Sequence, residues 1–159
     1  MLFYPKLVVA GVLSVALAGS VFAGSHSQAQ NEAAIKARQA HMDLYGFNMA
    51  TLGGMAQGKI DYDANAAQAA ASNIKALSGM NQMAYWLPGS DSEAMFDTRA
   101  LPELWGNIDD VIAKSKALND AATAMDAAAG KDLASLQDAI RPLGGACGAC
   151  HKAYRKPES

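Results

Sequence analysis

Five consecutive residues, Cys147-Gly148-Ala149-Cys150-His151, have the types and spacing that suit covalent chemistry with a porphyrin. In a Cys-x-x-Cys-His run the two thiols add across the vinyl groups of a haem, and the adjacent imidazole takes one axial position on the iron. Residues three and four apart share one face of a helix, so Cys147, Cys150 and His151 point at the same porphyrin if this segment is helical. The sequence therefore predicts one covalently bound haem c.

Two other uses of the cysteines are open to the sequence but less favoured by it. A Cys-x-x-Cys disulfide is typical of a thioredoxin-like βαβ context, and no strands of that kind are visible around Cys147 and Cys150. A zinc site needs a second pair of ligands, whereas the other histidines, His26 and His41, lie far away in the chain.

The first two dozen residues read as an export signal. Lys6 supplies a positive start, residues 7–18 form an apolar run, and Val21-Phe22-Ala23 offers small residues where a signal peptidase cleaves. We expect a signal peptide over residues 1–23, with cleavage after Ala29 as the alternative, and a periplasmic mature protein without a membrane segment. An uncleaved anchor is less favoured, because the apolar run is short for a bilayer.

Composition and charge favour one compact domain, which we place at residues 31–157. The chain has 159 residues, of which 51% are hydrophobic, enough for a single core. Its formal charge is −2, and losing Lys6 with the leader makes it −3. A mildly acidic chain without clustered basic residues is not typical of nucleic-acid binding, so we expect no nucleic-acid partner.

Apolar residues recur at helical spacing throughout the predicted domain, and almost no stretch alternates with the period of a strand. We expect helices over about 31–56, 64–85, 102–130 and 131–154, the last interrupted near Pro142, Gly144 and Gly145. Gly58 suits a helix end, Asp63 an N-cap, and Pro102 a first turn. The predicted fold class is all-α, an antiparallel four-helix bundle. One stripe of the first helix carries Ile35, Met42, Tyr45, Met49, Leu52 and Ala56.

A haem motif at the end of four helices resembles the class II c-type cytochromes, the group that contains cytochrome c′. Four segments carry the resemblance: Arg38-Gln39-Ala40-His41-Met42, Trp86-Leu87-Pro88-Gly89-Ser90, the stretch from Thr98-Arg99 to Trp105, and Cys147 through Tyr154-Arg155. The resemblance covers nearly the whole mature chain. It implies that Cys147 and Cys150 form thioethers and that His151 is the proximal iron ligand.

The resemblance also suggests roles for residues outside the motif. Arg38 and Gln39 would border the haem edge, with Arg38 as a propionate partner, and Arg155 would act on the imidazole or on a propionate. A surface arginine and a frayed tail are the plain alternatives for Arg38 and Arg155. The remaining candidates at the haem edge are Trp86, Thr98, Arg99 and Trp105, the two tryptophans being equally well explained as packing residues.

Met42 decides between two mechanisms. The family places this residue at the sixth iron position, where it either packs without bonding or ligates iron through its sulfur. We favour the open site, which implies binding of NO and CO in a pocket without a hydrogen-bond donor; the alternative is a pure electron carrier with His/Met ligation. His41 is a further candidate ligand, but it is one residue from Met42 and its neighbours Ala37 and Leu44 indicate an outer face.

We expect no enzymatic activity, because the sequence shows no catalytic arrangement of Ser/His/Asp or paired carboxylates. Small periplasmic redox partners fit either haem mechanism. The family commonly dimerises through its first two helices, and the resemblance therefore implies a homodimer. Residues expected to be exposed on those helices are Ala37, Leu44, Phe47, Ala67 and Ala71.

Overall fold

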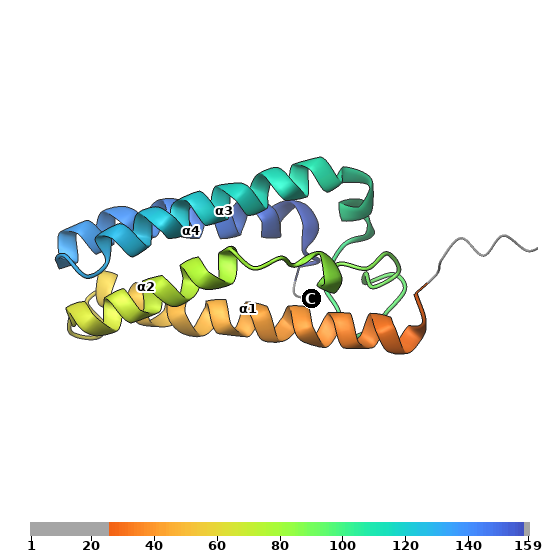
Figure 1. Cartoon of the computed structure of the whole chain (residues 1–159), viewed down its shortest axis with the longest axis horizontal. Coiled ribbons are helices and arrows are strands. Elements are labelled where there is room, and N and C mark those ends of the chain that lie inside the picture. Colours follow the sequence, from red (N-terminus) through yellow and green to blue (C-terminus); the bar gives the residue numbers. More distant parts are fainter. Residues whose placement is uncertain (1–25, 158–159) are drawn as a thin grey trace, which may run out of the picture.

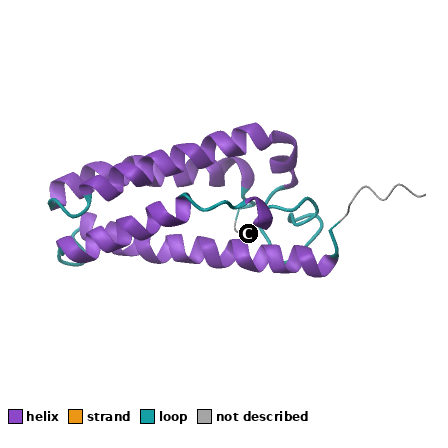
Figure 2. Cartoon of the chain, viewed as in Figure 1, coloured by secondary structure: helices purple, strands orange, loops and turns teal. Residues whose placement is uncertain are grey.

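The computed structural model describes residues 26–157, and in that range four long helices form an antiparallel bundle (Figures 1 and 2). They are α1 (Gln28–Ala56), α2 (Ala64–Ser78), α3 (Ile108–Ala128) and α4 (Leu133–Tyr154), with short 3-10 helices η1 (Met83–Tyr85) and η2 (Pro102–Asn107). The all-α four-helix fold is confirmed. Within the described range no helix is long and apolar enough to cross a membrane. The predicted signal peptide, 1–23, lies outside the described residues and stays a prediction.

Side-chain caps set the starts of three helices. Ser27 and Gln30 form a reciprocal capping box at α1, which therefore begins three residues before the predicted Asn31. The predicted cap Asp63 accepts a hydrogen bond from the Ala66 amide at 2.7 Å, and Asp132 caps α4 in the same way. Gly58, in the turn after α1, has the predicted left-handed backbone, with a φ of 66°.

Helix α2 ends at Ser78, so the predicted extension to Tyr85 is wrong. The Ser78 hydroxyl turns back to the Lys75 carbonyl at 2.9 Å, and Gly79 caps the helix. The chain then enters the long α2–α3 connection, residues 79–107, which includes η1 and η2. Side chains that compete for backbone groups end this helix earlier than its apolar periodicity indicates.

Helix α4 continues through Pro142, so the predicted interruption before the cysteines is absent. Pro142 lies on the exposed side of the helix, as do Gly144 and Gly145. Pro142 has no N–H for the carbonyl of Asp138, and because Asp138 is exposed, that carbonyl is accessible to water and the helix continues without a break. The haem motif is therefore the last part of one 22-residue helix.

The core lies between the four helices and is filled by aliphatic and sulfur side chains with many alanines on α2. Ala67 and Ala71 are fully buried. The expectation that these two residues are exposed for dimerisation is therefore wrong, because α2 uses its small side chains to pack closely inside the bundle. The largest fully buried side chains are Ile35, Leu52, Ile74, Leu104, Met125, Leu136 and Leu143.

A buried arginine on α1 holds the α2–α3 connection in place. Arg38 is 4% exposed, and its two terminal nitrogens donate four hydrogen bonds of 2.8 to 3.1 Å to the connection. The guanidinium also lies 4.5 Å from the centre of the Trp86 ring. Burial lowers the pKa of Arg38 to about 10, which still leaves it charged at neutral pH. The acceptors are the Tyr85 and Ser90 carbonyls and the Ser90 and Thr98 hydroxyls.

Asp91 organises the same connection from within. Its carboxylate accepts hydrogen bonds from the Trp105 indole at 2.9 Å and from the amides of Glu93 and Ala94. Burial alone would raise the pKa of this carboxyl, but these three donors, together with the backbone amide of Asp91 itself, outweigh burial and lower it. Its negative charge also favours the charged form of Arg38.

We predict that Arg38→Ala lowers the free energy of unfolding by about 3 kcal/mol, because it leaves four buried acceptors without their charged donor. Urea denaturation followed by circular dichroism measures the change. Lys36→Ala, at an exposed position on the same helix, is the control and should stay close to wild type. A loss below about 1 kcal/mol in Arg38→Ala would contradict the structural role.

We predict a specific pH dependence from Asp91. Because its pKa is lower in the folded protein than the ordinary 3.8, its contribution to stability is complete above that value and is lost as the pH falls through the folded pKa. Asp91→Asn should therefore lower stability at pH 7 and flatten the acid limb of a stability curve measured between about pH 6 and 2. The exposed Asp138→Asn is the control. Parallel acid limbs for Asp91→Asn and wild type would refute the assignment.

Candidate haem site

The three residues of the haem motif lie on the last two turns of α4. Cys147, Cys150 and His151 are all half-buried, and both cysteines are free thiols. Burial raises the pKa of each thiol, so both are protonated at neutral pH. An S–H group is what adds across a vinyl bond, so the arrangement suits thioether formation.

The geometry of the motif fits a haem. Cys147, Cys150 and His151 are three and four residues apart and therefore share one face of α4. Two free thiols and an imidazole on one helix face are the groups that hold a haem c. Once bound, a haem supplies an iron that carries one electron and can take a small ligand.

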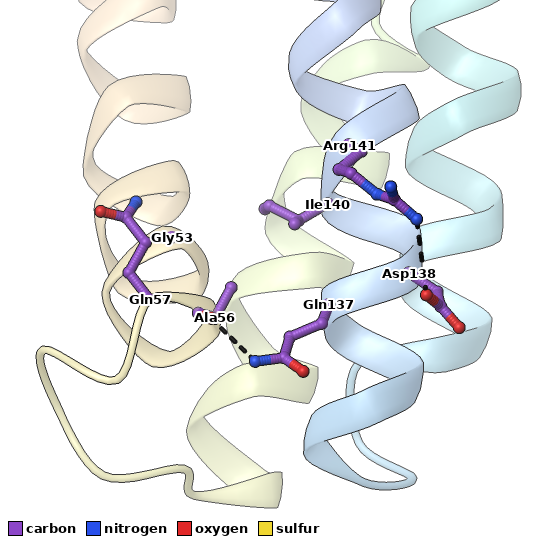
Figure 3. A pocket seen from close by; sticks show the side chains of 7 residues that line it. All are labelled: Gly53, Ala56, Gln57, Gln137, Asp138, Ile140 and Arg141. Carbon is purple, nitrogen blue, oxygen red and sulfur yellow. Dashed lines mark hydrogen bonds and ion pairs between the residues drawn. The ribbon is translucent and has the colours of Figure 1, made fainter.

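Met42 on α1 lies level with His151 on α4. The two helices touch at their other end, where the Gln137 amide donates to the Ala56 carbonyl at 2.9 Å (Figure 3). Counting fourteen residues back along α1 from Ala56 gives Met42, and fourteen forward along α4 from Gln137 gives His151. Fourteen residues are about four helical turns, or about 21 Å, so both positions return to the facing sides at the same height.

The structure reverses the expected exposure of Met42 and its neighbour. Met42 is 36% exposed, whereas His41 is 5% exposed and its ring packs 4.9 Å from that of Tyr45 and 5.9 Å from that of Tyr85. The predicted outer face for His41 is wrong, because α1 is covered on two sides. One side faces α4, and the other faces α2 and its connection, where burial lowers the pKa of His41.

The end of the described chain is fixed next to His151 rather than frayed. Arg155 forms an isolated antiparallel bridge with Ala100, which lies within the α2–α3 connection just before η2. Two backbone hydrogen bonds flank the bridge, one from the Leu101 amide to Tyr154 and one from the Lys156 amide to Arg99. Figure 1 shows the C-terminal end beside that connection.

Two arginines act electrostatically on the predicted iron ligand. Burial lowers the pKa of His151 first, and the charges of Arg155 and Arg99 lower it further. The Arg99 guanidinium also donates to the Lys156 carbonyl, at 2.9 Å from Nε and 2.7 Å from Nη2. An imidazole kept neutral in this way has a free lone pair, which is the form that binds iron.

The remaining candidate residues gather around Arg38. Trp86 and Thr98 contact its guanidinium, and the Gln39 amide donates to the Asp97 carbonyl at 2.5 Å. Of the three guanidinium nitrogens of Arg38, Nη1 and Nη2 make hydrogen bonds within the described chain and Nε makes none. Nε is therefore the donor that is left for a haem propionate. Contact of these four residues with haem stays a prediction.

Sequence reasoning missed two features of the site. Asp110 and Lys114 of α3 form an ion pair of 3.2 Å, Asp110 accepts a hydrogen bond of 2.5 Å from the Tyr154 hydroxyl, and both charges act on Cys150. The hydroxyl of Tyr45, assigned to an apolar stripe, is buried without a partner. Tyrosine in a core stripe usually finds a partner for its hydroxyl, and this was the available signal.

Comparisons with known proteins agree with the site and the fold. The family model described as Cytochrome C′ matches residues 33–155. Cytochrome c-554 of Cereibacter sphaeroides is 43% identical over 81% of this chain and 84% of its own, and cytochrome c′ of the same organism is 32% identical over 80% and 85%.

Solved structures show the same likeness. A cytochrome c′ from Rhodobacter sphaeroides superposes with a TM-score of 0.79 at 30% identity, covering 80% of this chain and 98% of that one. A cytochrome c′ variant from Alcaligenes xylosoxidans with bound NO superposes with a TM-score of 0.71 at 30% identity, covering 83% and 100%. The match of the family model over the helical domain, with the haem motif on its last helix, shows that this chain belongs to the cytochrome c′ family of class II c-type cytochromes, which are c-type haem proteins.

Proposed function

We propose that the protein carries one haem c, bound through Cys147 and Cys150, with His151 as the proximal iron ligand. The single observation that supports this most directly is the face of α4 that carries two free, protonated thiols and a neutral imidazole. Burial, and after it the charges of Arg155 and Arg99, lowers the pKa of His151 and keeps the imidazole neutral, and the bridge between Ala100 and Arg155 fixes the end of its helix.

We propose that the sixth side of the iron is open and binds NO and CO. The side chain that faces it is Met42, level with His151, and it comes from α1 without being packed into the core. A flexible thioether can fill such a space without forming a bond. Cytochrome c′ variants with bound NO and with bound CO are among the structural neighbours.

A second function, a pure electron carrier with His151 and Met42 both bound, has one observation in its favour. The register that brings Met42 opposite His151 serves a sulfur–iron bond as well as it serves packing. The chain is also more similar to the c-554 protein of Cereibacter sphaeroides than to the c′ protein of that organism. Electron exchange with small redox partners fits both functions, and neither requires turnover of a substrate.

We propose a periplasmic location and a homodimer formed through α1 and α2. The leader sequence at residues 1–23 supports export. Leu44 and Phe47 support the dimer, because they are 52% and 72% exposed on one side of α1, and burying them in a second copy is favourable. Ala37 lies exposed on the same helix.

Carbon monoxide separates the two haem functions. If the sixth side is open, the reduced protein, purified from the periplasm, should bind CO in a one-to-one ratio with a shifted Soret band, and Met42→Ala should bind it too. If Met42 ligates iron, the oxidised protein should show a sulfur-to-iron charge-transfer band that Met42→Ala removes. A reduced wild type that leaves the spectrum unchanged under CO would refute the open site, and intact mass without one added haem would refute the attachment.

Sedimentation tests the dimer. We predict that the wild type sediments as a dimer at micromolar concentration and that Phe47→Glu sediments as a monomer, because a charge at the centre of an apolar contact is not solvated there. Phe96→Glu is the matched control, since Phe96 is fully exposed on the α2–α3 connection rather than on α1. A monomeric wild type would contradict the proposal.

A further inference from the structure

Tyr45 is buried in the centre of α1, yet its hydroxyl has nothing to bond to. The residue is 6% exposed, and its hydroxyl oxygen is one of the buried atoms without a hydrogen-bond partner in the described chain. The Gln82 side chain approaches it but does not reach the distance and angle of a full hydrogen bond. Because an unpaired buried hydroxyl costs free energy, its presence needs an explanation, and a bound group that accepts its hydrogen bond is one.

The ring of Tyr45 extends toward the height of Met42 and His151. Long side chains on a helix lean toward its N-terminus, so the Tyr45 ring covers the turn that contains Met42 and His41. Its contact with the His41 ring, at 4.9 Å between centroids, agrees with that direction. The Tyr45 ring therefore lies at the height of the turn of α1 that carries Met42.

The hydroxyl also lies on the side of α1 that faces the haem motif. Cys147 of α4 is the second influence on the Tyr45 pKa, after burial, and the two together raise that pKa to about 12. The hydroxyl is therefore protonated at neutral pH and available as a donor. Its register on α1, three residues beyond Met42, corresponds on antiparallel α4 to Gly148, next to Cys147.

We propose that the Tyr45 hydroxyl donates a hydrogen bond to a polar diatomic ligand, such as dioxygen, bound on the sixth side of the iron. This rests on the proposed haem site and replaces the expectation of a pocket without a donor. Iron-bound dioxygen carries partial negative charge and gains from a donor, whereas bound CO is less polar and gains less. Tyr45 would therefore change the discrimination between these gases.

Tyr45→Phe tests the proposal, because it removes one oxygen atom and keeps the ring. The measurements are made on haem-loaded protein in the wild type and in a Met42→Ala background, in which no methionine can occupy the sixth side. We expect Tyr45→Phe to move the infrared CO stretch to higher wavenumber and to weaken dioxygen binding about fivefold, with less effect on CO affinity.

Tyr62→Phe is the matched control. The Tyr62 hydroxyl donates to the Ala129 carbonyl at 2.8 Å near the opposite end of the bundle, so its loss should leave the CO stretch unchanged. An unchanged CO stretch and dioxygen affinity in Tyr45→Phe would overturn the proposal. If Met42→Ala binds CO and the wild type does not, the open-site function is refuted, and the Tyr45 proposal is still tested in the Met42→Ala background. If Met42→Ala binds no CO, the open-site function and the Tyr45 proposal are both refuted.

Discussion

The buried guanidinium of Arg38 is the interaction on which the haem end of the bundle depends. No carboxylate contacts it in the described chain, and its hydrogen bonds go to two carbonyls and two hydroxyls of the α2–α3 connection. A charge that is solvated only by backbone and hydroxyl groups requires all of them at fixed positions. The irregular segment between α2 and α3 is therefore fixed against α1 at these positions.

This constraint divides the first helix into two functional sides. Arg38 and His41 face α2 and its connection, where they contact Tyr85. Met42 lies level with His151 of α4 and is the residue proposed to face the sixth side of the iron. Two neighbouring residues in the sequence thus serve different purposes, because 100° of helical rotation separates their side chains.

Features that depend only on residues close together in the chain could be predicted from the sequence. The caps at Asp63 and the turn at Gly58 depend only on neighbouring residues, and the spacing of Cys147, Cys150 and His151 carries its own geometry. The end of α2 and the burial of His41 depend on partners far away in the chain. Apolar periodicity finds one stripe on a helix, so it assigns the second covered side of α1 to solvent.

Arg38 shows more clearly what could not be predicted from the sequence. Its type and place in a family segment indicated a residue of the haem site, but its acceptors lie 47 to 60 positions later and two of them are backbone carbonyls. Every residue has a backbone carbonyl, so residue types cannot indicate which carbonyls accept these hydrogen bonds. The unpaired hydroxyl of Tyr45 could not be predicted either. The helical apolar pattern counts Tyr45 as a hydrophobic residue because of its ring and says nothing about its hydroxyl.

The bridge between Ala100 and Arg155 closes residues 100–155 into a loop whose two ends are held together by backbone pairing. The chain leaves residue 100, runs along α3, turns, returns along α4 and is fastened where it began. Tension applied to the chain after Arg155 would therefore be carried first into residues 99–101 of the α2–α3 connection, before it reaches the turn that bears the imidazole. A fusion partner attached there would pull on this fastening before it could unwind the helix that carries the cysteines.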